Sequence, residues 1–178
     1  NLTGLANRQL FRELLQHELQ RALRQGTQCA LLFIDLDRFK PINDAFGHDA
    51  GNVVLRAFAQ RLQQLVQDKG IAGRLGGDEF AVLTKPTETM RDLRALAEQV
   101  LVAARTPFAF GEHELTVSAS VGISIFPENG WTSAELVRSA DTAMYKSKKN
   151  GRNVLSFVSD DSCEILAQER SLLVRQLT

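Results

Sequence analysis

The sequence predicts an α+β domain in which helices flank a sheet containing antiparallel strands. Stripes of apolar residues at helical spacing alternate along the chain with short apolar runs of strand length. A Gly-Gly pair lies between two of these runs, which is typical of a hairpin between antiparallel strands. The 178 residues, 44% hydrophobic and 24% charged, suit one domain with a substantial core.

The first third of the chain reads as helix, strand, helix. One helical stripe comprises Leu10, Phe11, Leu14, Leu15, Leu19 and Leu23. Residues 30–35 form a wholly apolar run that ends in an acid, as expected of a buried strand whose carboxyl end lies at a functional site. A second stripe over residues 54–65 predicts the next helix.

The most informative segment follows at residues 71–83, where two apolar runs flank Gly76 and Gly77. Glycine reaches φ > 0 without steric cost, so the pair predicts a tight turn between two strands. A turn without side chains also allows a bulky ligand to approach the backbone. Asp78 and Glu79 follow the turn. The simplest interpretation of these four residues alone is a solvated hairpin tip.

The rest of the chain continues the alternation. Residues 93–101 predict a third helix, and residues 107–110 and 114–126 predict strands around a turn at Gly111. Residues 132–135 form a capping-box pattern that opens a fourth helix, which ends near residues 150–151. Residues 153–158 predict a last strand, and residues 160–178 have the spacing of an amphipathic helix.

Two acids, Asp35 and Asp78, lie at strand ends 43 residues apart, where neighbouring strands would bring them together. Two carboxylates about 4 Å apart repel by roughly 4 kcal/mol at an effective dielectric constant of 20. Such a pair requires a cation or a shared proton. Mg²⁺ suits the pair, because proteins hold it with one or two carboxylates together with substrate phosphates.

Five blocks of sequence, in order, resemble the GGDEF domain of the diguanylate cyclase family over nearly the full chain. They are residues 1–8, residues 35–44, the glycines and histidine at 47, 48 and 51, the signature at 76–80, and residues 140–153. The resemblance implies a palm-like sheet, centred on antiparallel strands, similar to the palm domains of polymerases and adenylyl cyclases. Residues 1–158 are expected to form this domain.

The resemblance also implies the reaction, in which two GTP molecules condense to cyclic di-GMP and two pyrophosphates. It places Mg²⁺, or Mn²⁺ in its stead, on Asp35, Asp78 and the carbonyl of Leu36. Glu79 is either a further ligand or helps to deprotonate the attacking hydroxyl. Each domain holds one GTP, so catalysis is expected to require a homodimer. Asp37 is expected to be structural, pairing with Lys40.

The same resemblance assigns the remaining contacts with GTP. The glycines of the turn let the nucleotide lie on the hairpin, and basic side chains meet the triphosphate. For Lys148 the alternative is a solvated helix end stabilised by the helix dipole. The residues assigned to GTP are Gly76, Gly77, the backbone of Arg38 and Phe39, Lys40, Lys148, Arg152, and Asn43 at the guanine edge.

The chain departs from the family pattern at two places. The family usually has an Asp after the glycine equivalent to Gly51, where this chain has Asn52. An Asp accepts both guanine donors, whereas an Asn presents one donor to a donor. The second place is residues 67–70, where an Arg-x-x-Asp site for inhibition by product is replaced by Gln-Asp-Lys-Gly.

Three functions therefore stay open from the sequence. The first is an active diguanylate cyclase. The second is a weak or inactive GTP-binding module that regulates an attached domain. The third is a cyclase with relaxed purine selectivity, because an Asn can pair with adenine.

Composition and the chain ends complete the expectations. The 21 basic and 21 acidic residues cancel, which argues against broad binding of nucleic acid. The sequence has no apolar run long enough to span a membrane and no visible signal peptide, and Cys29 and Cys163 show no paired spacing. A cytoplasmic domain is therefore expected. The chain opens within a motif, so upstream sensory domains, including a possible inner-membrane anchor, are expected. Residues 159–178 resemble a connector to an EAL domain, with a docking helix as the alternative.

Overall fold

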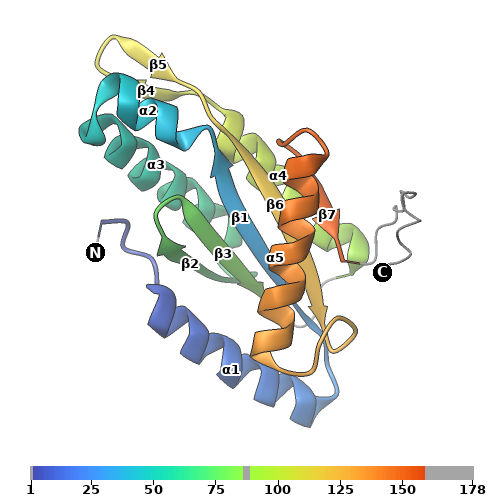
Figure 1. The fold of residues 1–178 in the computed structure, drawn as a ribbon. Coiled ribbons are helices and arrows are strands. Elements are labelled where there is room, and N and C mark those ends of the chain that lie inside the picture. The colour runs from blue at the N-terminus through green and yellow to red at the C-terminus, as the bar shows by residue number, and fades with distance from the viewer. Residues whose placement is uncertain (1, 86–88, 159–178) are drawn as a thin grey trace.

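A computed structural model describes residues 2–85 and 89–158, and it shows one mixed sheet with helices on both faces (Figure 1). The five strands lie in the order β2-β3-β1-β6-β7. β1 pairs antiparallel with β3 and β6, and β7 is parallel to β6. Their bounds are β1 Cys29–Asp37, β2 Gly70–Gly76, β3 Glu79–Thr84, β6 Ser118–Phe126 and β7 Leu155–Phe157. The predicted α+β fold with an antiparallel centre is confirmed.

Five helices and a small hairpin complete the described fold. The helices are α1 Arg8–Gln25, α2 Phe39–Phe46, α3 His48–Val66, α4 Met90–Arg105 and α5 Ser133–Lys149. The hairpin consists of β4 Phe108–Phe110 and β5 His113–Leu115. None of the helices in the described residues is long and apolar enough to cross a membrane.

The core is divided into two layers by the sheet. On one face, α3 and α4 pack against alternate side chains of β1, among them Leu32, Ile34 and Leu36. On the other face, α1 and α5 pack against Leu31, Leu83 and their neighbours. Because helices cover both faces, a central strand must be apolar at nearly every position, which explains the uninterrupted run in β1.

Some elements differ from the expectation. Only Phe11, Leu15 and Leu19 of the first stripe are buried, together with Ala22, while Leu10 and Leu23 are 46% and 60% exposed. The residues at intervals of three and four form the single row that faces the sheet, and Leu10 and Leu23 lie off that row.

The elements around the site were only partly expected. The eight-residue helix α2 was not predicted, because that segment carries binding residues rather than a clear helical stripe. The strand expected over residues 114–126 divides into β5, which turns back onto β4, and β6, which joins the main sheet. The last strand is limited to Leu155–Phe157. The helix expected at residues 160–178 lies outside the described residues.

The capping signals for α5 are confirmed. The Thr132 hydroxyl accepts from the backbone N–H of Glu135, and the Glu135 carboxylate accepts from the N–H of Thr132. The helix ends at the Asn150 cap, and Gly151 follows with φ 105°. These signals fix the length of α5 and hence the position of its basic C-terminal turn.

Cys29 is buried at the start of β1 as a free thiol. Burial, and then the charge of Glu18, raise the pKa of this thiol to about 12. Because the thiolate is the reactive form, Cys29 behaves as a small apolar side chain, as the sequence led us to expect.

The packing of α5 on β6 depends on Gly122. A Cβ at this position would overlap the carbonyl oxygen of Ala140 and the backbone of Met144. We expect Gly122→Ala to lower the free energy of unfolding by about 1–3 kcal/mol, because overpacking pushes the helix away from the sheet. Urea unfolding measures this.

The control is Glu114→Ala, which changes an exposed strand position and is expected to alter the free energy by less than about 0.5 kcal/mol. A Gly122→Ala domain as stable as the parent would contradict the close approach of helix and strand.

Candidate active site

The carboxyl end of β1 and the turn between β2 and β3 lie side by side. Asp35 of β1 is paired in register with Glu79 of β3. The backbone N–H of Leu36 donates to the carbonyl of Asp78 over 3.1 Å. The expectation that neighbouring strands bring Asp35 and Asp78 together is therefore confirmed.

The signature turn is stabilised by one arginine and has no side chains at its tip. Gly76 and Gly77 have φ 146° and 49°, and nothing lies within 4 Å of a Cβ built at either position. The Arg74 guanidinium donates twice to the carbonyl of Gly77, over 3.1 and 2.8 Å. The backbone of the turn is thus open to a ligand while its conformation is fixed by Arg74.

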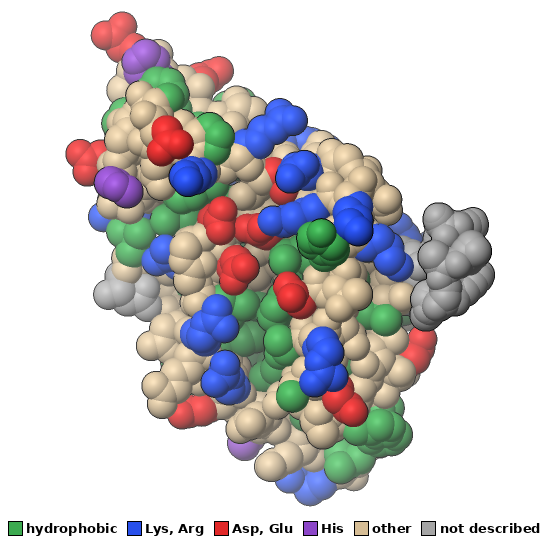
Figure 2. Space-filling view, in the orientation of Figure 1, with side chains coloured by type: hydrophobic (Ala, Val, Ile, Leu, Met, Phe, Trp, Pro, Cys, Tyr) green, Lys and Arg blue, Asp and Glu red, His purple; other side chains and the backbone are tan. Residues whose placement is uncertain are grey.

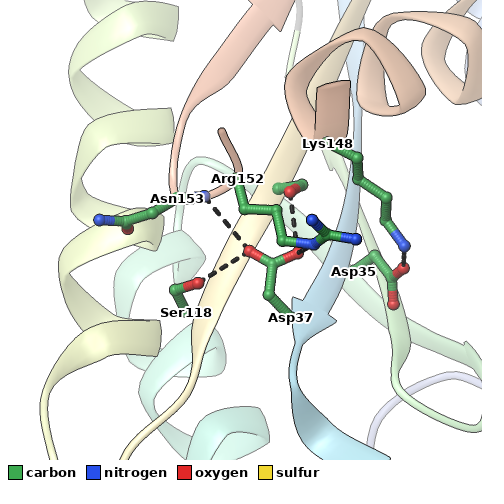
Figure 3. A network of polar contacts seen from close by, with 7 residues as sticks. Asp35, Asp37, Ser118, Lys148, Arg152 and Asn153 are labelled. Carbon is green, nitrogen blue, oxygen red and sulfur yellow. Dashed lines mark hydrogen bonds and ion pairs between the residues drawn. The ribbon is translucent and has the colours of Figure 1, made fainter. Parts of the chain in front are cut away.

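Asp35 is buried and has one paired and one unpaired oxygen. The Lys148 ammonium, from the last turn of α5, donates to Oδ2 and forms an ion pair with it (Figure 3). Oδ1 is buried without a hydrogen-bond partner. Burial lowers the pKa of Lys148, but the hydrogen bond and charge of Asp35, with the charges of Asp37 and Asp78, raise it overall. Lys148 is therefore a permanent cation at the site.

The pKa of Asp78 is raised from 3.8 to about 6. Burial is the largest cause, followed by the negative charge of Asp35 and the hydrogen bond that a protonated Asp78 can donate to Asp35, and Lys148 opposes the shift. Two carboxylates in one partly buried place thus resist ionising together. The unpaired oxygen of Asp35 and the neighbouring carboxyl group of Asp78 are oxygen ligands of the kind that bind a hard divalent cation.

Asp37 lies two residues beyond Asp35 and has a structural role, as expected. Its oxygens accept from the hydroxyls of Ser118 and Ser120 over 2.8 and 2.9 Å and from the N–H of Asn153 over 3.2 Å. Its ion pair is with Arg152, at 3.9 Å, so the expected pairing with Lys40 is wrong. Lys40 is exposed on α2, whereas Asp37 is buried against β6.

Figure 3 shows Lys148 and Arg152 above the end of β1, each directed at a different acid. Arg152 and Asn153 follow α5 with φ 62° and 54°, a left-handed conformation that costs energy for residues other than glycine. The hydrogen bond from Asn153 to Asp37 holds this segment in place. Lys148 is thus paired with the functional acid Asp35, whereas Arg152 is paired with the structural acid Asp37.

The start of α2 lies on the other side of β1. Arg38 is the N-cap residue, with φ 62° and no side-chain cap, so the first N–H groups of the helix lack that partner. The side chains of Arg38 and Lys40 are exposed, whereas that of Phe39 is buried in the core. The burial of the Phe39 side chain limits any contact of this residue with a phosphate to its backbone.

Asn43 and Asn52 lie on the adjacent helices α2 and α3. The Asn43 Oδ1 is buried without a hydrogen-bond partner, and a Cβ at Gly51 would overlap it. A side chain at position 51 would therefore displace the Asn43 amide from the position it holds here. Asn52 follows Gly51 and is half-buried. An unpaired buried amide oxygen is the feature expected of a site whose ligand supplies the missing donor.

Arg8 belongs to the first block that resembles the family, and its sequence context predicts no role for it. Its Nε donates to the carbonyl of Leu75 over 3.0 Å, and its Nη2 lies 3.8 Å from Oε1 of Glu79. Ala6, two residues before Arg8, also pairs with the hairpin, because it forms a bridge with Gly73 and its carbonyl accepts from the N–H of Arg74. The segment before α1 thus fixes the outer edge of the signature hairpin.

Glu79 accordingly faces Arg8. Within residues 2–85 and 89–158, no three His, Cys, Asp or Glu side chains form a cluster that could hold a metal ion. The acids whose charges interact strongly enough to shift a pKa are Asp35 and Asp78, while Glu79 is the strand partner of Asp35.

The whole domain matches a known family. Residues 1–154 match the model of the family described as diguanylate cyclase, GGDEF domain, and the chain belongs to this family. It is 40% identical over 177 residues to the bifunctional diguanylate cyclase/cyclic di-GMP phosphodiesterase MucR of Pseudomonas aeruginosa. It is 36% identical over 173 residues to the diguanylate cyclase TpbB of the same species. The matches cover 99% and 97% of this chain but 26% and 40% of those relatives.

Solved structures share the fold. The GGDEF domain of TpbB superposes with a TM-score of 0.86 at 37% identity, covering 94% of this chain and 98% of that one. The GGDEF domain of DgcB from Caulobacter crescentus, solved in complex with c-di-GMP, gives a TM-score of 0.83 at 28% identity, covering 89% and 94% of the two chains. The predicted family and the palm-like cyclase fold are confirmed.

The acid pair leads to a prediction about protonation. The raised pKa means that the folded domain holds this proton more tightly than the unfolded chain. The contribution of Asp78 to the free energy of unfolding therefore falls as pH rises between 3.8 and about 6. We expect Asp35→Asn to lower the pKa of Asp78 and Lys148→Met to raise it further, as measured by NMR titration of the carboxyl carbon with a chelator present.

Burial remains in the Asp35→Asn variant, so the pKa is expected to return only part of the way to 3.8. The control is Asp141→Asn, which removes an exposed acid of α5 and is expected to leave the titration unchanged. An unaltered pKa of Asp78 in Asp35→Asn would show that the two acids do not interact.

Proposed function

We propose that this chain is a Mg²⁺-dependent diguanylate cyclase, which condenses two GTP into cyclic di-GMP and two pyrophosphates. The observation that carries the proposal is the pairing of Asp35 with Asp78 beside a turn without side chains, with Lys148 next to them. The family to which the chain belongs supports it. In the reaction, the 3′-hydroxyl of each GTP attacks the α-phosphate of the other.

The metal is assigned to Asp35 and Asp78, with the Leu36 carbonyl beside them. When bound, Mg²⁺ or Mn²⁺ would neutralise charge on the phosphoryl oxygens and the attacking hydroxyl. The unpaired Oδ1 of Asp35 and the raised pKa of Asp78 support this assignment. Glu79 is the strand partner of Asp35 and lies 3.8 Å from Arg8, and its two proposed roles are a further metal ligand or an acceptor for the proton of the attacking hydroxyl.

The triphosphate is assigned to the surfaces on either side of the acids. Lys148 and Arg152 supply positive charge from the end of α5, and Lys40 supplies it from α2. The backbone N–H groups at Arg38 and Phe39 are hydrogen-bond donors for phosphate oxygens. Positioning and neutralisation of this kind are the main sources of catalysis in phosphoryl transfer.

The guanine is assigned to the polar side chains of α2 and α3, where the unpaired Oδ1 of Asn43 would accept from the base. The side-chain amide of Asn52, on the adjacent helix α3, presents an N–H donor where guanine also has N–H donors. An unsatisfied buried group costs about 1–3 kcal/mol. That cost favours, as a second candidate, a weak cyclase or a GTP-binding module that regulates an attached domain.

Two domains are required for the product, because each holds one GTP and cyclic di-GMP has two-fold symmetry. We therefore propose that a homodimer forms the complete site. MucR and TpbB are longer than this chain, which supports covalently linked domains, including an EAL domain, in the whole protein.

Inhibition by product at the usual second site is proposed to be weak. Gln67 lacks the guanidinium fork that would clamp a phosphate. Gly70 has no side chain, and a Cβ there would overlap the carbonyl of Leu83 on the paired strand. The acid of the family pattern therefore does not fit this strand pairing without a shift of the backbone.

The proposal predicts that Asp35→Ala and Asp78→Ala each reduce turnover at least a hundredfold while the thermal midpoint of the domain is preserved. Loss of one carboxylate leaves a divalent cation too weakly held to neutralise the triphosphate. The measurement is incubation with Mg²⁺ and GTP, ATP or both, with chromatography of the products at several enzyme concentrations.

The parent should form cyclic di-GMP with a specific activity that rises with enzyme concentration. Addition of a chelator should stop formation of the product. Asp68→Ala, at an exposed acid after α3, is the control that is expected to retain the parental rate. A rate in Asp78→Ala above a tenth of the parental value would refute the metal assignment.

Base recognition provides a separate prediction. We expect Asn52→Asp to tighten the binding of a non-hydrolysable GTP analogue by roughly 5- to 150-fold, because the carboxylate accepts from both guanine donors. Binding of the matching ATP analogue should not improve. Calorimetric titration measures both affinities.

Gln60→Glu adds the same negative charge at an exposed position of α3 and is the control for a general charge effect. Unchanged affinity in Asn52→Asp would mean that residue 52 does not touch the base.

A further inference from the structure

A hollow separates α1 from α5 on their shared face of the sheet. It has a volume of about 580 Å³ and is bounded by α1, the signature hairpin and the first half of α5. Phe33 lies at its base and is the one residue of β1 that is only half-buried. Figure 2 shows hydrophobic side chains in this hollow between the two helices, with Lys or Arg side chains on both sides. The centre of the sheet is therefore uncovered at this point.

The base of the hollow is apolar. Its apolar lining comes from α1, β1, β2 and α5 and includes Phe11, Leu15, Phe33, Leu75 and Val137. Phe11 and Leu15 are buried, while the other three are half-buried. A concave apolar surface of this volume is within the range of small-molecule sites.

The rim carries three arginines and two acids. Arg8 is already bound to Leu75 and faces Glu79. Arg12 of α1 and Arg138 of α5 line opposite walls, and among the described residues the guanidinium group of neither has a hydrogen bond or an ion pair. Asp141, the second acid, is exposed. A planar guanidinium fork matches a carboxylate, so the hollow combines an apolar base with two available partners for an anion.

We propose that this cavity binds a small carboxylate with an apolar body, of the size of a medium-chain fatty acid. The apolar body lies on Phe33 and its neighbours, and the carboxylate lies at the rim between Arg12 and Arg138. The ligand would contact Leu75 and Glu79, which flank the signature turn. Its effect on turnover therefore rests on the proposed function, whereas the binding itself does not.

The test is calorimetric titration of the domain with decanoate, below its micelle concentration and without nucleotide, together with amide NMR spectra. We expect saturable one-to-one binding, with shifts confined to α1, the hairpin, the part of β1 around Phe33, and residues 133–141. Decanol and decyltrimethylammonium keep the chain and lack the anion, so they should bind at least tenfold more weakly.

Variants separate the two parts of the site. Arg12→Gln combined with Arg138→Gln should weaken decanoate at least tenfold, and Ala134→Trp, which fills the cavity from α5, should do the same without lowering the thermal midpoint. Arg91→Gln, an exposed arginine of α4 outside the cavity, is the matched control and should leave the affinity unchanged.

Asp78→Ala should bind decanoate like the parent, so failure of the proposed cyclase reaction and failure of this site give different results. No saturable binding, equal binding of the cationic probe, or full affinity in the double arginine variant would each overturn the proposal.

Discussion

The structure is organised around two carboxylates that the fold forces together. Asp35 is buried at the end of the central strand, and Asp78 follows the signature turn on the adjacent hairpin. Their repulsion is offset on one side by the ammonium of Lys148 and is visible in the raised pKa of Asp78. A strand covered on both faces, a glycine turn and the last turn of α5 must all be in place for this arrangement.

Two acids of β1 on the same face of the sheet have different roles because their surroundings differ. Asp37 receives hydrogen bonds from two serines and one backbone N–H, with Arg152 close by. Asp35 keeps one oxygen unpaired. Asp37, whose oxygens are hydrogen-bonded, fixes the segment after α5. This contact places the basic end of α5 beside Asp35, which keeps an unpaired oxygen. A structural acid thus positions the groups that surround the functional acid.

The hairpin is stabilised by contacts within its turn and along its outer edge. The second set of contacts links the start of the domain to the candidate active site. Arg74 closes the turn from within, and the segment of Ala6 and Arg8 pairs along its outer edge. The hollow between α1 and α5 shares Leu75 and Glu79 with the same hairpin. The segment before α1 and the hollow therefore both contact the hairpin that contains Asp78.

The sequence by itself determined the features whose causes are local. The Gly-Gly pair predicted the hairpin, the Thr132 pattern predicted the start of α5, and the apolar run ending in Asp35 predicted a buried strand. Ordered motifs also identified the family. Only the tertiary structure decided that Arg8 contacts Leu75 and Glu79, that Asp37 pairs with Arg152, and that Lys148 reaches Asp35 across 113 residues. Local patterns limit the backbone, whereas the partner of a charged side chain depends on sheet register and helix placement.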